Sequence, residues 1–435
     1  MNEFSEKGIY FLPLGGADEI GMNMYVYVVN GKMLVVDAGY GFLADDYPGM
    51  ELAYASPEFF AEHQGQIEGL FVTHAHEDHM GAVGQIWPYL KCPIYASDFT
   101  LGLIKERLAE FKLDEEVPLI SATKTKCFDF EDFSVEFIQV AHSVPQTCAL
   151  AIRTKYGNIL HATDWRFDDE KLSVLPTDFE ALKRFSDQGV DMLVCDSTNV
   201  MVNEKLPSES DVRKSLLKLI PQIEGGVIVT LFSSNLVRLE SLIMAAEEAG
   251  RSPVLFGRSL LTNIKIAREC GYFQDFPKVY SAEEAKDIPA DNAMYICTGS
   301  QANYRSALMS IANGESKYVK IDASDTVIFS SKVIPGNEAR IERLQDKFEE
   351  TGAKVITDET ALVHASGHAN RDDLKKMYDL LKPAIVLPVH GDKKFIREHK
   401  RFALTCGVKD VFSARNGEVC LLRDKSIEKI AEVPT

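Results

Sequence analysis

The sequence lacks the features that would place a protein in a membrane or send it out of the cell. No apolar run reaches the roughly 18 residues that indicate a membrane-spanning helix. The N-terminus has no basic segment leading into an apolar one, which a secretory signal needs. We therefore expect neither a membrane span nor a signal peptide.

Paired cysteines are also lacking. None of the eight cysteines forms a C-x-x-C pair, and most of them fall in apolar runs. Isolated cysteines of this kind are typical of free thiols in a reducing compartment. We therefore expect a cytoplasmic protein without disulfides.

Basic residues are fewer than acidic ones. The chain has 47 lysines and arginines against 65 aspartates and glutamates, a net charge of −18 at pH 7. Binding to phosphate gains from counterions released at lysine and arginine, so the overall field disfavours a protein that coats nucleic acid. A local basic channel remains compatible with this composition.

Length and composition are those of a soluble protein with several domains. Hydrophobic residues make up 46% and charged residues 26% of the chain, as in globular proteins generally. A length of 435 residues exceeds one ordinary core and predicts two or three domains. An inserted domain would not show as a simple linear split.

Histidines are concentrated in one stretch, Thr73-His74-Ala75-His76-Glu77-Asp78-His79, which follows the apolar run 70–72. A strand that ends in a turn points His74 and His76 the same way, whereas Asp78 and His79 leave the turn toward a neighbouring point. Imidazole and carboxylate are the ligands expected for zinc, or for manganese where oxygen donors dominate. The stretch predicts two divalent ions side by side. A solvated surface loop is the alternative, which so many ligands in one turn disfavour.

Three further polar residues follow apparent strands. Asp37 ends the run 33–37, His142 follows residues 135–140, and Asp164 follows a hairpin about Tyr156-Gly157. Alone, Asp37 would be expected to cap a turn, but beside a metal cluster it is better placed to orient a ligand imidazole. Strand ends are where ligands from distant parts of a chain meet, although an isolated histidine there is more often a satisfied polar residue.

From about residue 211 the pattern changes to alternating strands and helices. This pattern predicts a small parallel sheet covered by helices, and the segment contains no cluster of metal ligands. Histidines then return at His364, His368 and His390, before helices expected at 372–381 and 393–406. Asn370 is the expected N-cap of the first of these helices.

These motifs resemble those of a known family. The run 74–79 is similar to the H-x-H-x-D-H signature of the metallo-β-lactamase superfamily, with Asp37, His142 and Asp164 in that superfamily's order. Similar to motifs of its β-CASP branch, which acts on nucleic acids, are Asp196-Ser197-Thr198-Asn199, His364-Ala365-Ser366-Gly367-His368 and Pro388-Val389-His390-Gly391. Within that branch, the segments that resemble ribonuclease J are 15–23, Thr298-Gly299-Ser300-Gln301 and Ile334-Pro335-Gly336-Asn337-Glu338. The resemblance runs from about residue 11 to 422.

The resemblance implies an α/β fold, namely a metallo-β-lactamase αββα sandwich with an inserted β-CASP domain built on a small parallel sheet covered by helices. We place the first part of the metallo-β-lactamase domain at residues 1–205, the β-CASP insertion at 206–352 and the second part at 353–435. Ribonuclease J chains usually continue into a C-terminal domain that supports dimerisation. None is expected within this sequence, so a homodimer is one assembly left open.

The resemblance also implies the roles of the site residues. One metal would be held by His74, His76 and His142, and the second by Asp78, His79 and His390, with Asp164 bridging and Asp37 behind the ligands. Asp78 would accept a proton, and His368, oriented by Asp196, would stabilise the transition state or protonate the leaving oxygen. Two divalent ions, zinc or else manganese, are the expected cofactors.

A site for the 5′-phosphate of single-stranded RNA is expected at a helix start. Unpaired N–H groups there, with the positive end of the helix dipole, favour an anion. The expected residues are Ser330, Ser331, Ser366, Gly367, His368 and Asn370. A pocket for one phosphate should favour a 5′-monophosphate over a triphosphate.

The implied function is a two-metal ribonuclease that cleaves RNA from its 5′ end, internally, or both. One alternative is a hydrolase of a small thioester or lactone, which the motifs at Asp196 and His368 disfavour. Another is a non-catalytic RNA-binding subunit, for which a full ligand set has no chemical need.

Three polar residues have no assigned catalytic role. Gln146 stands where the family often has an acidic residue, and its consequence is open. His161 is either packed or a neighbour of the ligands. His364 is expected to be a hydrogen-bonded loop residue.

Overall fold

The computed structural model describes residues 4–42, 52–168, 176–274, 276–334 and 336–435; Pro335 of the motif quoted above lies outside these residues. The chain divides into two compact units. The first contains the described residues up to Lys205 together with Gly367–Thr435, and the second contains Leu206–Ser366. The first unit is therefore assembled from two distant parts of the chain.

An eight-stranded sheet forms one layer of the first unit, with strand order β23-β22-β1-β2-β3-β6-β7-β8. The strands from β23 to β3 in this order pair antiparallel, and β3, β6, β7 and β8 pair parallel. Its strands are β1 (Ile9–Gly15), β2 (Met24–Val29), β3 (Lys32–Val36), β6 (Ile67–Phe71), β7 (Ile94–Ala96), β8 (Leu119–Ser121), β22 (Glu418–Arg423) and β23 (Ser426–Glu432). A separate small pair is β4 (Gly41–Phe42) with β5 (Leu52–Ala53).

A seven-stranded sheet forms the second layer, with order β21-β20-β13-β12-β11-β10-β9. Its strands are β9 (Cys127–Asp129), β10 (Ser134–Gln139), β11 (Cys148–Thr154), β12 (Gly157–His161), β13 (Met192–Asp196), β20 (Ile385–Val389) and β21 (Asp410–Val411). The two sheets share one core, in which Val36 and Phe71 of the first sheet belong to the same cluster as Leu150 and Val194 of the second. Burial of such apolar faces is the main force that holds the layers together.

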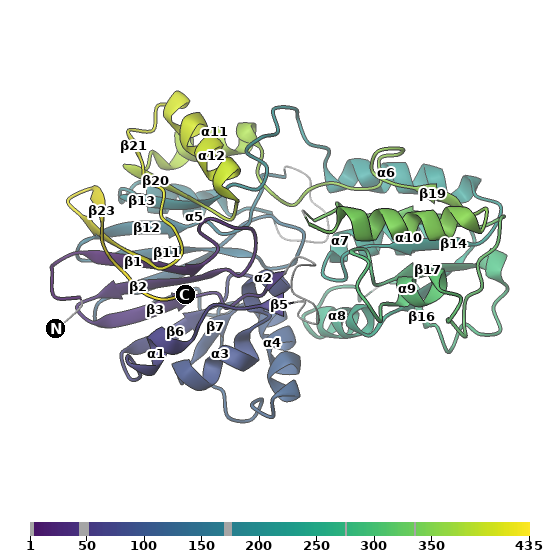
Figure 1. The fold of residues 1–435 in the computed structure, drawn as a ribbon, viewed down its shortest axis with the longest axis horizontal. Coiled ribbons are helices and arrows are strands. Elements are labelled where there is room, and N and C mark those ends of the chain that lie inside the picture. Colours follow the sequence, from purple (N-terminus) through teal and green to yellow (C-terminus); the bar gives the residue numbers. More distant parts are fainter. Residues whose placement is uncertain (1–3, 43–51, 169–175, 275, 335) are drawn as a thin grey trace. The chain divides into compact units, whose positions relative to one another are not determined.

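Helices cover the outer faces of this sandwich (Figure 1). Those of the first unit are α1 (Glu58–Ala61), α2 (Glu77–Met80), α3 (Val83–Leu90), α4 (Asp98–Glu110), α5 (Phe179–Ser186), α11 (Arg371–Leu381) and α12 (Lys393–Thr405). Leu182, Met377 and Ala403 from α5, α11 and α12 pack with Leu193 and Val386 of the second sheet. On the other side α4 packs against β7, β8 and α3. This is the αββα arrangement that the sequence predicts.

The second unit contains a six-stranded sheet in which every described pair is parallel, with order β16-β15-β17-β14-β18-β19. Its strands are β14 (Val227–Thr230), β15 (Ser252–Phe256), β16 (Tyr280–Ser281), β17 (Ala293–Cys297), β18 (Thr326–Phe329) and β19 (Lys354–Ile356). Its helices are α6 (Glu209–Leu219), η1 (Ile220–Gln222), α7 (Leu236–Glu248), α8 (Arg258–Glu269), η2 (Ala290–Asn292), α9 (Ala307–Ala312) and α10 (Glu338–Glu350). Leu308 of α9 and Leu344 of α10 pack with Ile228 and Val327 of the sheet.

Two boundaries differ from the expectations. The insertion was expected to end at residue 352, but β19 pairs parallel with β18, so its sheet continues past that point and the second unit runs to Ser366. The sequence from residue 80 to 90 predicts a single helix, whereas in the structure α2 ends at Met80 and α3 begins at Val83. No helix in the described part of the chain combines the length and apolar character that a membrane crossing demands.

Candidate metal centre

The histidine-rich stretch lies where the central strand β6 ends. Thr73 and His74 follow the buried strand, and His76 takes the N-cap position of the short helix α2. His79 falls one turn into that helix and is buried, as is His74. The strand end and the helix start therefore point the ligands of this stretch inward.

Three imidazoles form the first donor set. Nδ1 of His76 lies 3.0 Å from Nε2 of His74 and 3.2 Å from Nε2 of His142. Burial, reinforced by the neighbouring histidines, lowers the pKa of His76 to about 4 and of His142 to about 3. Both rings are thus neutral near pH 7 and offer lone pairs to a cation. Ligands 2.0–2.1 Å from zinc at tetrahedral angles lie about 3.3 Å apart, close to these separations.

The outer nitrogens of two of these rings are held by hydrogen bonds. Nδ1 of His142 donates to the carbonyl of Gly367 at 2.7 Å, and Nδ1 of His74 lies 3.1 Å from the Thr73 hydroxyl. A partner on the outer nitrogen fixes the tautomer and directs the other nitrogen into the site. These contacts prepare both rings to bind a cation.

The second donor set contains more carboxylate. Nε2 of His390 lies 3.1 Å from Oδ2 of Asp78, which in turn is 3.7 Å from Nε2 of His79. Burial alone would lower the pKa of His79, but the carboxylates of Asp164, Asp78 and Asp37 raise it to about 10. The surrounding carboxylates thus favour positive charge at this point, and a metal ion bound through an unprotonated Nε2 would supply it in place of a proton.

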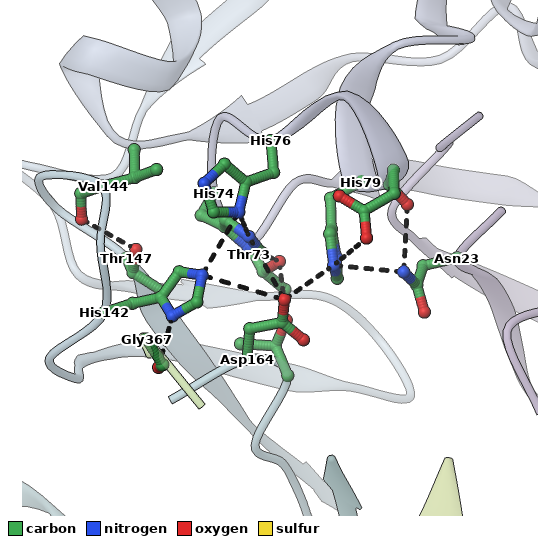
Figure 2. Close-up of polar contacts among 12 residues, drawn as sticks. Asn23, Thr73, His74, His76, His79, His142, Val144, Thr147, Asp164 and Gly367 are labelled. Atoms are coloured by element: carbon green, nitrogen blue, oxygen red, sulfur yellow. Dashed lines mark hydrogen bonds and ion pairs between the residues drawn. The ribbon is translucent and has the colours of Figure 1, made fainter. Parts of the chain in front are cut away.

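Asp164 lies between the two sets (Figure 2). Its Oδ2 is 3.7 Å from Nε2 of His74 and 3.8 Å from Nε2 of His142 on one side, and 3.3 Å from Nε2 of His79 on the other. Its Oδ1 is buried and accepts no hydrogen bond from the described residues, and Nδ1 of His390 stays 3.6 Å away. A buried carboxylate oxygen without a donor is costly unless a cation is placed there.

The donors therefore fit divalent metal ions. One group is His74, His76, His142 and Asp164, another is Asp78, His79, Asp164 and His390, and within each group the ligand atoms lie within 4.8 Å of one another. Nitrogen donors prevail in the first group, and oxygen and nitrogen are balanced in the second, a combination suited to zinc and compatible with manganese.

Asp37 sits behind the ligands. Its Oδ2 accepts from Nδ1 of His79 at 2.7 Å, and its carboxylate also accepts from the backbone N–H and the hydroxyl of Thr73 at 2.8 and 2.9 Å. The carboxylate is fully buried. Asp37 therefore orients the imidazole of His79, one of the donors of the second set.

Strained backbone surrounds the site. Asp37, Thr163 and His390 have φ values of 60°, 53° and 54°. Non-glycine residues rarely adopt this region, and for a β-branched residue such as Thr163 it is especially unfavourable. The surrounding packing enforces these conformations, and each one sets the direction of a site side chain.

Asp196 and His368 form a pair beside the second donor set. Nδ1 of His368 lies 2.9 Å from Oδ2 of Asp196 and 3.9 Å from Oδ2 of Asp164. Burial lowers the pKa of His368, but the two carboxylates outweigh burial and raise it above its ordinary value. The raised pKa favours the protonated ring, which is the form that a general acid needs.

Sequence reasoning missed several residues that hold the ligands. Nδ2 of Asn23 donates to the carbonyl of Asp78 at 3.0 Å and lies 3.1 Å from Nε2 of His79. The carbonyl of Gly16 accepts from the backbone N–H of His390 at 2.7 Å, and the Thr198 hydroxyl lies 2.8 Å from Nδ1 of His390. Asn23 and Thr198 lie in segments for which the sequence indicates a resemblance to the family but no such contacts.

The structure answers the questions left open about His161 and Gln146. Nδ1 of buried His161 lies 2.9 Å from the hydroxyl of Tyr27, so the ring packs under the site. Oε1 of Gln146 accepts from the backbone N–H of Phe99 at 2.9 Å, in the first turn of α4. Gln146 thus supplies a hydrogen bond at the start of α4, where the N-cap residue Ser97 makes no side-chain capping bond.

The residues expected to bind a phosphate belong to both units. Ser330 is buried in the second unit, where its hydroxyl donates to the carbonyl of Val363 and accepts from Arg238. In the first unit Asn370 caps α11 as predicted, by accepting from the N–H of Asp373. A Cβ on Gly367 would lie 2.8 Å from the His142 ring, so a close approach to a ligand explains this glycine. The phosphate site stays a prediction.

The fold and the site define a hydrolase of the metallo-β-lactamase superfamily. The model of that superfamily matches residues 18–223, the ribonuclease J β-CASP domain model matches 224–348, and the model of the Zn-dependent metallo-hydrolase RNA specificity domain matches 360–409. These matches confirm the predicted fold class and its inserted domain.

Curated relatives identify the family. The chain is 39% identical to ribonuclease J of Sinorhizobium meliloti over 99% of its own length and 77% of the relative's, and 36% identical to that of Mycolicibacterium smegmatis over 94% and 74%. It spans 63% of the Helicobacter pylori (strain J99) enzyme at 33% identity. A protein of unknown function from Enterococcus faecalis shares the fold, with TM-score 0.66, 15% identity and coverage of 96% of this chain and 100% of the other. The chain belongs to the ribonuclease J family and is a metal-dependent nuclease.

Proposed function

We propose that this chain is a two-metal ribonuclease that hydrolyses phosphodiester bonds of single-stranded RNA from the 5′ end, internally, or both. The observation that carries the proposal is the position of Asp164, whose Oδ2 lies within 3.8 Å of nitrogens from both donor sets. A shared carboxylate is what two adjacent ions need.

The ligand assignment follows the two groups. His74, His76 and His142 would hold one ion; Asp78, His79 and His390 would hold the other; and Asp164 would serve both. When bound, a pair of divalent ions supplies an activated water and neutralises charge on the phosphodiester oxygens. The hydrogen bonds to the outer ring nitrogens of these histidines keep the donor atoms aligned.

Acid and base roles divide between two residues. The side chain of His368 is 21% exposed and is held by Asp196, so it is both oriented and accessible to a leaving oxygen. The Asp78 side chain is equally exposed, at 21%, whereas that of Asp164 is only 2% exposed. Accessibility supports Asp78, rather than Asp164, as the acceptor of a proton from the attacking water.

The alternatives are less well supported. A thioester or lactone hydrolase would not need the pair of Asp196 and His368, and the chain has a domain match described as RNA-specific. A non-catalytic RNA-binding subunit would not need strained residues such as Thr163 beside complete donor sets. Catalysis on RNA accounts for both observations.

The experiment compares RNA labelled at the 5′ end with the same RNA labelled internally, with zinc or manganese and after chelation. Parallel reactions contain single-stranded DNA, a thioester and a lactone. Metal-dependent release of 5′ mononucleotides supports exonuclease action, and shortened internal fragments support endonuclease action. Substrates with 5′-hydroxyl, monophosphate and triphosphate ends test the expected preference for monophosphate. Hydrolysis of only the thioester or lactone would overturn the proposal.

A further inference from the structure

One buried histidine of the first unit takes no part in the metal centre. His399 on α12 has no exposed surface, and its Nδ1 lies 2.8 Å from Oγ of Ser197. Its Nε2 forms a hydrogen bond with the hydroxyl of Tyr378 on α11. Burial lowers the pKa of His399 to about 4, so its neutral ring offers one donor and one acceptor. The three side chains form one continuous hydrogen-bonded chain in the interior.

Ser197 connects this hydrogen-bonded chain of side chains to the candidate metal centre. It stands between Asp196, which holds His368, and Thr198, whose hydroxyl is hydrogen bonded to His390. The Thr198 hydroxyl also donates to Oδ1 of Asp196 at 2.6 Å. The turn 196–198 therefore holds two active-site histidines, and its middle residue is anchored in the interior through its hydroxyl.

The two helices that carry Tyr378 and His399 start beside those same two active-site histidines. Helix α11, which carries Tyr378, begins shortly after His368, and α12, which carries His399, begins shortly after His390. A Cβ on Gly391 would lie 3.0 Å from Cβ of Ser197, so the start of α12 closely approaches the turn. Any shift of either helix would thus move a histidine relative to the turn that orients it.

We propose that Ser197, His399 and Tyr378 are positioning residues that fix the turn 196–198 against α11 and α12, and thereby align His368 and His390 for hydrolysis. The proposal rests on the proposed function, because it assigns these residues to that reaction. Small displacements of reacting groups cost up to about a hundredfold in rate. None of the three side chains touches a metal ligand's donor atom, so metal binding should survive their loss.

The test measures kcat, KM and metal content of Ser197→Ala, His399→Leu and Tyr378→Phe on 5′-monophosphorylated RNA. We expect kcat to fall about tenfold or more in the first two variants, with KM and metal content near those of the parent chain. His399→Asn places an amide near the position of Nδ1 and should recover part of kcat. Tyr378→Phe removes only the hydroxyl oxygen, so it tests the hydrogen-bonded chain even if His399→Leu does not fold.

Ser186→Ala is the matched control. Its hydroxyl donates to the carbonyl of Leu380 at 2.8 Å, so this variant removes a hydrogen bond to α11 without touching the turn. An equal loss of kcat in this control, or unchanged kcat in Ser197→Ala and His399→Leu, would overturn the positioning role. An inactive parent chain would instead refute the proposed function, which keeps the two failures apart.

Discussion

Oδ2 of Asp37 lies 2.7 Å from Nδ1 of His79, although the two residues are 42 positions apart in the sequence. The same carboxylate accepts two hydrogen bonds from Thr73, so every donor around it requires an acceptor. An amide at this position would turn an NH₂ group toward one of these donors. The contact fixes the tautomer of His79 that faces the site.

Asp37→Asn is therefore expected to weaken metal binding without removing a ligand. Loss of such a supporting partner typically costs about 10- to 100-fold in metal affinity. Competition against a chelator measures the affinity, and Asp114→Asn on the surface loop after α4 is the control. Equal affinities of the parent chain and Asp37→Asn would contradict the orienting role.

Asp164→Ala is expected to abolish RNA hydrolysis and to lose part of the bound metal, because Asp164 is, among the residues that the structure describes, the carboxylate common to both donor sets. Asp164→Asn keeps the volume of this buried side chain and separates loss of charge from loss of packing. Elemental analysis of the purified variants gives the occupancy. Full occupancy in both would refute the bridging role.

His368→Ala should keep its metal but lose turnover, because His368 would act on the leaving group and is assigned to neither ion. Loss of an aligned general acid costs about a hundredfold or more. Adding Asp196→Asn should cost less than Asp196→Asn does in the parent chain, since part of the effect of Asp196 acts through His368 at 2.9 Å. Wild-type rates in His368→Ala, or full additivity in the double variant, would remove His368 from the mechanism.

Stability should depend on pH through His399. Its pKa is about 4 in the folded chain and about 6.5 when unfolded, so below pH 6.5 the unfolded chain binds more protons. The stability that the neutral, buried ring contributes is complete above about pH 6.5 and is lost as the pH falls toward 4. The loss between pH 7 and pH 5 is about 2 kcal/mol.

Urea unfolding at pH 7 and pH 5 checks this dependence. His399→Asn lacks the titrating group but retains the other histidines, so the parent chain should lose more stability than the variant over this interval. Identical pH dependence in both proteins would show that His399 does not titrate differently on folding.

That the candidate ligands gather at one candidate metal centre could largely be predicted from the sequence, because they lie in short motifs whose residue types have few other uses. His74, His76 and His79 are brought together by one strand end and one helix start, which are local structures. The network behind them could not be predicted in the same way. Ser197 and His399 are 202 positions apart, and nothing in either segment alone indicates the contact.

The fold shows the same division between local and distant information. The apolar pattern of residues 236–248 predicts a helix with the bounds that α7 has, because that pattern is local. The break between α2 and α3 depends on tertiary contacts, since the N–H of Ala82 donates to the carbonyl of Ala38 and the N–H of Asn23 takes up the carbonyl of Asp78. Likewise β19 has only three residues and is recognised as part of the insertion by its pairing with β18 across α10, so the insertion extends beyond the expected residue 352.

The second unit should depend on one buried ion pair for its stability. Arg238 on α7 has no exposed surface, and its guanidinium donates to both carboxylate oxygens of Glu209, at 3.0 and 2.8 Å. Nη1 also donates to the carbonyl of Val363 at 2.7 Å and to Ser330. Arg238→Met would leave the Glu209 carboxylate without its charged partner and would remove one donor from Val363 and Ser330.

We expect Arg238→Met to lower the free energy of unfolding by about 3–5 kcal/mol, the range for breaking one partner of a buried pair. Arg238→Met with Glu209→Gln should be less destabilised than the sum of the single changes, because the second change removes the uncompensated charge. Denaturant unfolding measures all three variants. Lys375→Met, which breaks an exposed pair with Asp379 on α11, is the control and should leave unfolding unchanged. A loss in Arg238→Met no larger than in this control would mean that the buried pair does not stabilise the unit.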